Sequence, residues 1–426
     1  MGAALDFGTF NGQVGGLSNQ LSENVGNVPG NLYNVDANLD FRKQFSTVNF
    51  TDLEARFNIA ALVNDESLSM FSLKEAYIGK RFTNKDYFRI GRQVLDWSPI
   101  DSTWGFGKLN NRVNFDFFNP DQEGLIGLLY ERKSTNHMRY QVFGSVLYVP
   151  ELNPALDVND RRKTIKSRHP WADAPATTAD VQGSQKSIEY TVEMPKSSEV
   201  VRRASFGGNI GWDSKHWVFD NFFMRKPENQ ISQKVGVQFN SITDRIEAQV
   251  KPQFYYHDVL GSSFRYRNAD VELYVSGIMV KPNTFPDVNN DAVLQTEIKS
   301  KKYREDYLGG GISRINDLYG MGFSYVARLS NYDRDKETLS LDPRWNQAIN
   351  IFLSRRLFQR LNLSTDLKYD MLTTDRLIML RASFAATKEF MMNLGVNMIG
   401  TPNDGKSFWS PYTNNDALYA GLRYIF

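Results

Sequence analysis

The sequence predicts an all-β protein, a transmembrane antiparallel up-and-down β-barrel of about 18 strands with outer bounds of about 16 and 20. Segments of roughly ten residues alternate apolar and polar side chains, which is the length that a tilted strand needs to cross a bilayer. Short connections between these segments alternate with long ones. The chain also ends on ALYAGLRYIF, in which Leu418, Ala420, Leu422, Tyr424 and Phe426 share one face of a strand. We expect the apolar faces to meet lipid.

Composition is compatible with this fold and excludes several others. Mean hydropathy is −0.45, but only alternate residues of a barrel strand face lipid, so a hydrophilic average does not contradict it. No apolar run is long enough for a transmembrane helix. The 426 residues contain no linker or low-complexity tract, so we expect one barrel domain over residues 1–426. The opening MGAALDF lacks the pattern of an export signal, which we therefore expect to have been removed.

Charge and cysteine content narrow the function classes. The net charge of +2, with Lys and Arg scattered singly, gives no support to nucleic-acid binding. The absence of cysteine removes disulfides, thiolate catalysis and zinc–thiolate sites. Four histidines are present, and neither HxxxH nor HExxH occurs, so we expect no metal, no cofactor and no enzymatic activity.

The strands can be placed in chain order from the period-two pattern. NVDANLDFR (34–42) and LNLSTDLKYDM (361–371) show it most clearly, with apolar residues on one face and charged or amide residues on the other. The expected strands cover residues 4–12, 33–44, 50–63, 70–82, 86–96, 124–134, 138–148, 204–214, 217–226, 270–281, 305–315, 319–332, 344–357, 360–373, 376–388, 391–401 and 416–426. An odd number must lie within 230–266, where KVGVQF, IEAQVKPQFYY and SFRYR compete. One strand there gives about 18 in a closed sheet, and three give about 20; we predict 18.

The connections indicate how the barrel is oriented. Tight turns are expected at 83–86, 134–137, 213–215, 315–317 and 388–390, and longer segments at 13–32, 97–123, 149–203, 282–304, 332–343 and 402–415. Strict alternation of this kind predicts a periplasmic rim of short turns and an outer rim of long loops. The alternative is an antiparallel sandwich with one wet face, which would have some strands covered on both sides. Aromatic residues at strand ends (Tyr33, Trp217, Trp345, Tyr369) are interpreted as interfacial girdles.

The polar faces then line the lumen, and they carry both signs of charge. Basic residues fall on neighbouring strands around the seam where the last strand meets the first: Arg42, Arg56, Arg81, Arg89, Arg381 and Arg423. Acidic residues such as Asp40 and Glu54 are mixed among them. These charges either pair with one another and keep the lumen wet, or form a basic wall that attracts anionic or zwitterionic solutes.

Residues 97–123, WSPIDSTWGFGKLNNRVNFDFFNPDQE, are the candidate constriction loop. The segment is too aromatic for a surface loop, so we expect it to fold inward and shelter its rings against the lumen wall. Its charged residues would then face the pore opposite the arginines: Asp101, Asp116, Asp121 and, at its end, Glu123, together with Lys108 and Arg112. The alternative is a loop that caps the outer mouth.

Two further segments are expected outside the membrane. Residues 149–203 contain the basic stretch DRRKTIKSRHPW and the strand-like SIEYTVEM. They form either a mobile loop or a hairpin beyond the membrane, with the basic stretch touching lipopolysaccharide phosphates. Residues 282–304 are read as a second long extracellular loop.

The closed even-stranded pattern, the inward loop and the terminal Phe426 together resemble Gram-negative outer-membrane porins. GRQVLDWSPIDSTWGFGKLNNR (91–112) is similar to the substrate-selective and export porins, in which a GRQ strand leads into the pore-narrowing loop. The resemblance implies an outer-membrane channel for passive diffusion of small hydrophilic solutes or ions, in contact with lipid and lipopolysaccharide, and a homotrimer. The alternative function is a surface-display barrel that acts as adhesin or receptor through its long loops.

Overall fold

The computed structural model describes the chain apart from residues 1–8, 16–30, 46–50, 63–69, 83–84, 114–117, 119, 135, 152, 154–155, 168–174, 284–295, 300–302, 331–342, 403–406, 414–415 and 425–426. Its main feature is one sheet of 18 strands. They are β1 Thr9–Gly15, β2 Asn31–Phe45, β3 Thr51–Leu62, β4 Met70–Arg81, β5 Asp86–Gln93, β8 Leu125–Lys133, β9 Met138–Ser145, β14 Ser205–Asp213, β15 Trp217–Pro227, β18 Tyr256–Arg267, β19 Val271–Asn283, β21 Glu305–Ile315, β22 Tyr319–Arg328, β23 Gln347–Leu357, β24 Leu361–Asp370, β25 Arg376–Ala385, β26 Phe390–Gly400 and β27 Ala417–Tyr424.

The sheet closes on itself. Each of these strands pairs antiparallel with the next along the chain, and β27 pairs with β1 from Thr9 opposite Arg423 to Gly15 opposite Ala417. The wall therefore leaves no edge with unpaired backbone groups. The prediction of 18 wall strands is confirmed, and the stretch 230–266 supplies one of them, β18. The first strand was predicted at 4–12, and β1 covers Thr9–Gly15, so it ends three residues later than predicted. Residues 4–8 lie outside the described part.

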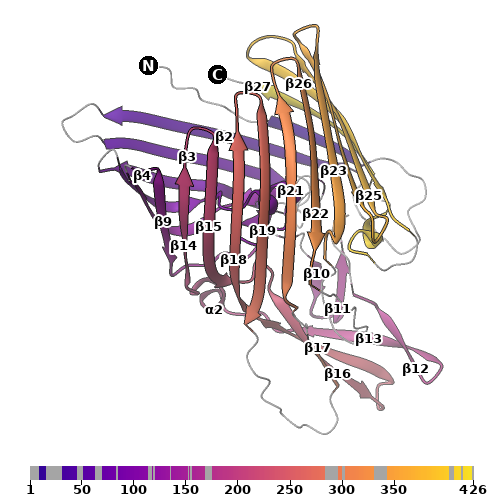
Figure 1. Cartoon of the computed structure of the whole chain (residues 1–426). Coiled ribbons are helices and arrows are strands. Elements are labelled where there is room, and N and C mark those ends of the chain that lie inside the picture. The colour runs from indigo at the N-terminus through magenta and orange to yellow at the C-terminus, as the bar shows by residue number, and fades with distance from the viewer. Residues whose placement is uncertain are drawn as a thin grey trace.

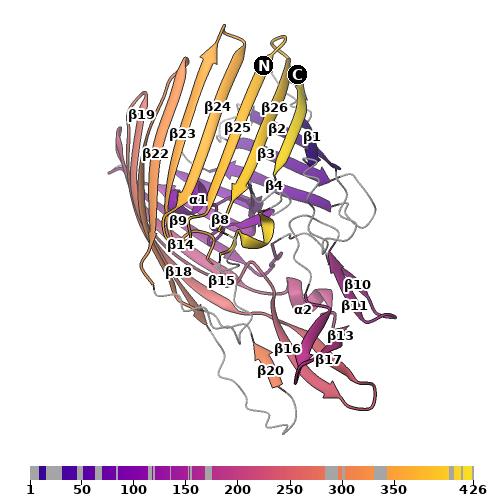
Figure 2. The same ribbon diagram turned by 90° about the vertical axis from the view of Figure 1, so that its right-hand side faces the viewer.

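The two rims differ, as Figures 1 and 2 show. The start of β1 and the end of β27 lie at the rim of short turns, and the long connections gather at the opposite rim. The predicted alternation is not strict, because residues 371–375 make a tight turn at the long-loop rim. Asp370 Oδ1 accepts hydrogen bonds there from the N–H groups of Leu372 and Thr373, at 2.9 and 3.3 Å.

Three of the long connections build a second sheet beyond the wall (Figure 1). Its order is β12 Thr178–Val181, β13 Ser184–Val192, β17 Arg245–Gln253, β16 Ser232–Asn240 and β20 Thr296–Lys299. Of the two alternatives for this segment, the structure has the hairpin: SIEYTVEM supplies most of β13, which pairs antiparallel with β12. The connection from β9 to β14, which supplies β12 and β13, also contains a smaller hairpin and a helix. The hairpin is β10 Leu156–Asn159 with β11 Thr164–Ser167, and the helix is α2 Ser197–Val201.

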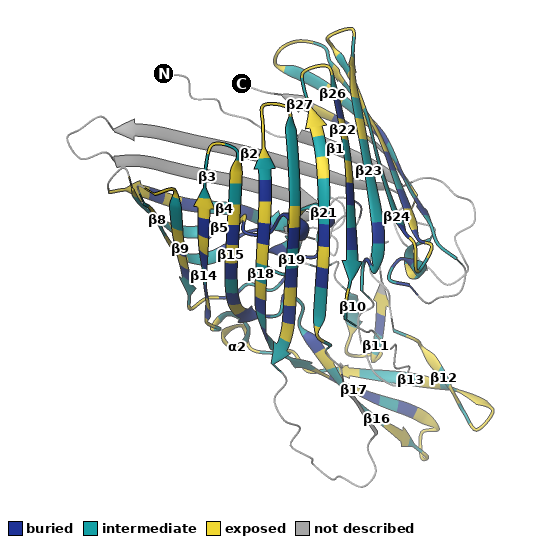
Figure 3. Cartoon of the chain, viewed as in Figure 1, coloured by how far each residue is buried: buried dark blue, intermediate teal, exposed yellow. Residues whose placement is uncertain are grey.

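Burial alternates along the wall strands, as Figure 3 shows for β14, β15, β18 and β19. On β15, Asp220, Phe222 and Met224 are buried, whereas Trp217 and Phe219, which point to the opposite face of the strand, are exposed on the outer face. Large apolar side chains such as Ile78, Ile210, Val275, Leu353 and Leu394 are exposed on the outer face around the barrel. Within the described residues, no helix is long and apolar enough to cross a bilayer.

Candidate constriction site

The segment that follows β5 folds inward and begins with a short helix. Ser98 caps α1, Pro99–Trp104, by accepting a hydrogen bond from the Asp101 N–H, and Pro99 suits the first turn because it has no N–H to satisfy. The helix ends at Gly105, whose φ of 61° is the left-handed conformation that glycine adopts without strain. The inward fold of this loop was predicted from its aromatic content and is confirmed.

Two side chains hold the loop in a compact shape. The Asp101 carboxylate accepts hydrogen bonds from the N–H groups of Lys108 at 2.8 Å and Leu109 at 2.9 Å. The Asn110 amide accepts from the Leu95 N–H and donates to the Leu95 carbonyl, both at 2.9 Å, as a neighbouring strand would. The chain leaving α1 is thereby tied back to the chain entering it.

An ion pair joins the two ends of the loop. Arg92 is the penultimate residue of β5, and its Nη2 lies 2.6 Å from Oε2 of Glu123, just before β8; Arg92 Nε donates to the Gly124 carbonyl at 3.0 Å. Both side chains are buried. The GRQ stretch therefore has a structural role here, because its arginine fixes the points at which the loop leaves and re-enters the wall.

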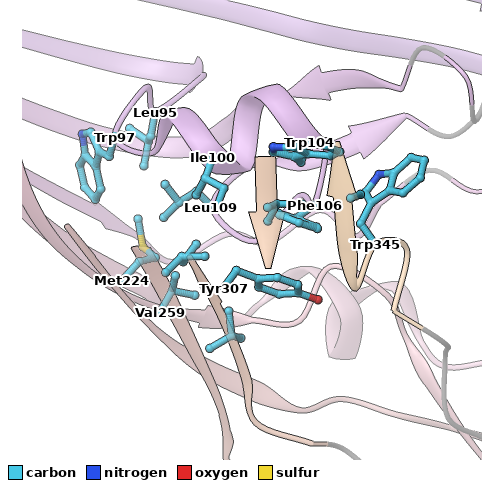
Figure 4. Close-up of a cluster of buried hydrophobic side chains, with 14 of the residues drawn as sticks. Leu95, Trp97, Ile100, Trp104, Phe106, Leu109, Met224, Val259, Tyr307 and Trp345 are labelled. Atoms are coloured by element: carbon cyan, nitrogen blue, oxygen red, sulfur yellow. The ribbon is translucent and has the colours of Figure 1, made fainter. Parts of the chain in front are cut away.

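The aromatic side of the loop packs on the inner wall (Figure 4). Phe106 stacks on Tyr307 of β21 with ring centroids 4.3 Å apart, and Trp104 meets Trp345 edge-on at 5.8 Å. Trp345 in turn lies 5.4 Å from Trp409. Wall residues that complete this buried cluster come from β8, β9, β15, β18, β19, β21, β22, β23, β25 and β26. Trp345 is therefore not the girdle residue that its place in the sequence predicted, because the loop covers it.

A cavity of about 150 Å³ lies between the loop and the wall. Its basic lining residues are Lys108 and Arg112 from the loop and Arg328 and Arg344 from the wall and its connections; its acidic ones are Glu151, Glu228 and Glu305. Lys108 Nζ is 2.7 Å from Glu305 Oε1, and Arg112 Nε is 3.9 Å from Glu151 Oε2. The cavity thus presents both signs of charge to anything that enters it.

A second charged cluster lies on the inner wall nearer the short-turn rim. The buried Asp220 of β15 pairs with Arg139 of β9 and with Arg265 of β18, the latter at 2.9 Å, and accepts a hydrogen bond from Asn209 at 2.9 Å. Arg265 also lies 3.7 Å from the exposed Asp96 at the start of the loop. Arg139 also lies 3.7 Å from Asp213, so the two guanidinium groups of this cluster are shared among three carboxylates.

The predicted basic residues occupy wall strands. The register aligns Arg42 with Glu54, Glu54 with Gly79 and Gly79 with Arg89. Arg89 lies over the rings of Tyr77 and Tyr87 at 5.6 and 5.1 Å and is 3.8 Å from Glu131. Further predicted residues are placed by strand or register alone: Arg56 opposite Asp40 and Tyr77, Arg81 opposite Tyr87, Arg381 opposite Ser364 and Gly395, and Arg423 opposite Met391 and Thr9. The side chains of Arg42, Arg56, Arg423, Asp40, Glu54 and Asp121 and the whole of Asp116 lie outside the described part.

Two of the four predicted loop acids differ from the expectation that they face the pore, and the other two, Asp116 and Asp121, lie outside the described side chains. Asp101 and Glu123 are buried, with 2% and 0% of their surface exposed, because their carboxylates serve the loop's own N–H groups and Arg92. Sequence reasoning also missed Glu151, Glu305 and Arg328, which reach the cavity from separate connections and strands. For Glu305 and Arg328 the signal would have been a charged residue on the inward face of a wall strand, next to the long-loop rim; Glu151 lies in a connection and had no such signal.

Comparison with known proteins adds distant likenesses of fold. No protein-family model matches the chain, and no curated protein matches it closely enough to count. Among solved structures it is similar to OccK11 (OpdR) of Pseudomonas aeruginosa, with TM-score 0.48 and 9% identity over 99% of this chain and 95% of that one. It is also similar to OccAB4 of Acinetobacter baumannii, with TM-score 0.46 and 9% identity over 99% of this chain and 96% of that one. A variant of the Rh. blastica porin is similar with TM-score 0.43 and 8% identity over 99% of both chains.

At these scores the fold assignment rests on the strand pairings themselves. The chain has the architecture of a closed antiparallel barrel of 18 strands. A closed wall, an apolar outer face and a loop folded inside it are all present in the described residues.

Proposed function

We propose that the chain is a porin of a Gram-negative outer membrane, through which small hydrophilic solutes or ions diffuse passively. The observation that supports this most is the closed 18-stranded wall, with large apolar residues exposed outside and charged residues inside. Lipid replaces water around such a wall at no cost in unpaired backbone groups. The outer-membrane location, contact with lipopolysaccharide, removal of an export signal and homotrimeric assembly are parts of the same proposal.

The solute preference in this proposal follows from the charges. Lys108, Arg112, Arg328 and Arg344 meet three carboxylates around one cavity, and Arg89 of β5 lies on a different part of the wall, 3.8 Å from Glu131. A field between fixed charges inside a low-dielectric wall selects solutes by charge and dipole. We infer a preference for anionic or zwitterionic solutes over cations.

Single-channel recording in planar bilayers under a salt gradient tests the proposal. Stable ohmic steps are expected from the purified protein, and replacing Arg42, Arg56 and Arg81 by Gln should move the reversal potential toward cation selectivity. Arg304→Gln is the matched control, because Arg304 is exposed and lies on the outer-face groove. An unchanged reversal potential in the triple variant would remove the basic wall from the proposal.

The same recordings separate the channel from a display barrel that acts as adhesin or receptor. A channel should still conduct after deletion of residues 154–200, because the wall strands β9 and β14 pair directly with each other and do not need that connection. A wild-type protein that inserts and stays silent would favour the display barrel. A protein that stays monodisperse in buffer without detergent would contradict the membrane location altogether.

A further inference from the structure

One register row on the inner wall carries polar side chains on several neighbouring strands. It runs through Arg265 on β18, Tyr274 on β19, Gly311 on β21, Ser324 on β22 and Asn350 on β23, each opposite the next. The row lies on the short-turn side of the constriction loop. A Cβ on Gly309, the previous inward position of β21, would lie 2.8 Å from the Ile100 side chain of α1. The loop therefore packs against the wall directly beside this row.

A cavity of about 290 Å³ lies between this row and α1. The four side chains of the row line it, together with Ser102 and Thr103 of the helix and Phe352, the next inward residue of β23. A Cβ on Gly311 would lie 2.7 Å from the Tyr274 ring and 2.9 Å from Ser324 Cβ. Glycine at this position therefore lets the Tyr274 ring lie across β21 toward Ser324. The volume is close to the lower end of small-molecule sites, roughly 300 Å³.

Four buried polar atoms of the row make no hydrogen bond of normal geometry within the described residues: Arg265 Nε, Tyr274 Oη, Ser324 Oγ and Asn350 Oδ1. The Tyr274 hydroxyl lies close to Thr103 and Ser324, so these groups face the same space. Buried polar groups in proteins are almost always paired, because one left without a partner costs free energy. Four such atoms in one register row indicate a place where a polar ligand, or the water that it replaces, supplies the partners.

The charged residues of the cavity are already paired. Arg265 lies 2.9 Å from Asp220 and 3.7 Å from Asp96. Arg267 lies 3.2 Å from Glu272. The lining contains two basic and two acidic residues, so its formal charges balance. A charged solute would have to displace one of these pairs to find a counter-charge, whereas a neutral solute leaves all of them intact.

Hydroxyl groups on a neutral solute meet these requirements. A hydroxyl both donates and accepts, so it can pair with the hydroxyls of Tyr274 and Ser324 and with the Asn350 carbonyl oxygen alike. Neighbouring strands lie about 4.8 Å apart, so a solute needs several hydroxyls along one edge to reach these groups together. The Phe352 ring adds an apolar surface beside them, as in small-molecule sites that combine apolar walls with a few fixed polar groups.

We propose that this cavity is a binding site for a neutral sugar ring, or a polyol of that size, on the short-turn side of the constriction. Its chemistry differs from that of the cavity around Glu305 and Arg328, where both signs of charge are presented. A solute that passes the loop would meet charged groups on one side and hydroxyl and amide groups on the other. This place on a diffusion path rests on the proposed function, whereas the binding itself requires only the folded barrel.

Three variants and a matched control test the site. Tyr274→Phe and Ser324→Ala each remove one hydroxyl with little change in shape. Gly322→Leu fills the cavity, which Gly322 lines. A Cβ there would lie 3.4 Å from its nearest neighbour, Ser313 Cβ, which is ordinary contact, so the wall should accept it. Ser276→Ala is the control, because the Ser276 side chain is also buried on β19 but does not line the cavity.

The measurement is isothermal titration of the detergent-purified barrel with D-glucose, D-galactose and D-ribose, and with D-glucuronate as a charged analogue. At least one neutral sugar should bind saturably to the parent. Tyr274→Phe and Ser324→Ala should each weaken that binding by about three- to tenfold, the loss expected from one hydrogen bond. Gly322→Leu should abolish it, and Ser276→Ala should leave it unchanged.

Failure of all three neutral sugars to bind would overturn the inference and would mean that water alone pairs these atoms. Sugar binding that Gly322→Leu leaves unchanged would also overturn it, as would D-glucuronate binding that is tighter than that of every neutral sugar and insensitive to Tyr274→Phe and Ser324→Ala. Ohmic conductance by a protein that binds no sugar would leave the proposed channel intact. Sugar binding by a barrel that does not conduct would keep the site and remove the channel, so the two proposals fail separately.

Discussion

The buried pair Arg92–Glu123 gives the sharpest test of how the loop is held. Glu123→Gln keeps the shape of the side chain and leaves the Arg92 guanidinium buried without its counter-charge, where it now lies 2.6 Å from the carboxylate. Breaking a buried ion pair from one side costs about 3–5 kcal/mol. Because Arg92 Nε keeps its hydrogen bond to the Gly124 carbonyl, we expect the low end of that range, about 3 kcal/mol.

The assay is equilibrium urea unfolding in detergent micelles, followed by tryptophan fluorescence, since Trp97 and Trp104 lie in the loop that the pair closes. The control is the double variant Arg92→Met with Glu123→Leu, which removes both charges and should lie close to the parent. A Glu123→Gln protein within about 1 kcal/mol of the parent would refute the reasoning, because ordinary surface pairs contribute that little. A double variant as unstable as the single one would mean that packing, and not charge, is responsible.

Three other outcomes are expected. Trp104→Ala should lower the free energy of unfolding by about 3–5 kcal/mol, because removing the ring leaves a cavity under the loop. The loop should then be held less firmly and the distribution of single-channel current levels should widen. An unchanged urea midpoint would contradict this. Asp101→Ala should cost about 1–3 kcal/mol in the same unfolding assay, since two buried N–H groups lose their acceptor, and Asp101→Asn should recover part of it. In the outer sheet, hydrogen bonds from Lys163 and then Arg245 lower the pKa of Glu189, so its contribution is present above its unfolded pKa and is lost as pH falls through the lower folded value. Limited proteolysis of residues 178–192 should therefore accelerate below a pH of about 4, and Glu189→Gln should be equally sensitive at all pH values.

The wall was predictable because each strand must satisfy a local pattern and a global count together. The expected strand 305–315 coincides with Glu305–Ile315, and 391–401 with Phe390–Gly400 to within a residue. Period-two alternation locates a strand, and closure requires an even number of them. These two conditions limited residues 230–266 to one or three wall strands, and the structure places one there, β18.

The second sheet was only partly predictable for the same reason. KVGVQF and IEAQVKPQ alternate as wall strands do, and they form β16 and β17 beside β13, away from the wall. Alternation shows that the apolar face of a strand is covered. It does not show whether lipid or another part of the chain covers that face. The parallel pairing of β13 with β17 joins two connections far apart in the chain, which no local signal encodes.

The site was the least predictable part, because charge in the sequence does not reveal what a side chain contacts. Asp101 and Glu123 were expected to face the pore, but the Asp101 carboxylate accepts hydrogen bonds from N–H groups of the loop, and the Glu123 carboxylate pairs with Arg92. Lys108 and Arg112 do line the cavity, but their acidic partners Glu305 and Glu151 come from distant segments. Those pairs depend on the loop's path across the lumen, which the charged residues themselves do not encode.

One signal in the sequence does report that path. Along the inner face, wall strands change from polar to apolar toward the long-loop rim: Asp220 precedes Met224 on β15, and Ser276 precedes Val280 on β19. On these strands the alternation fails in stretches such as FFM (222–224) and GIMV (277–280), where both faces are apolar. A barrel strand with two apolar faces needs lipid on one side and protein on the other, so such stretches mark the wall that an inward loop covers. The polar halves of the same strands then remain to line the water-filled part of the lumen.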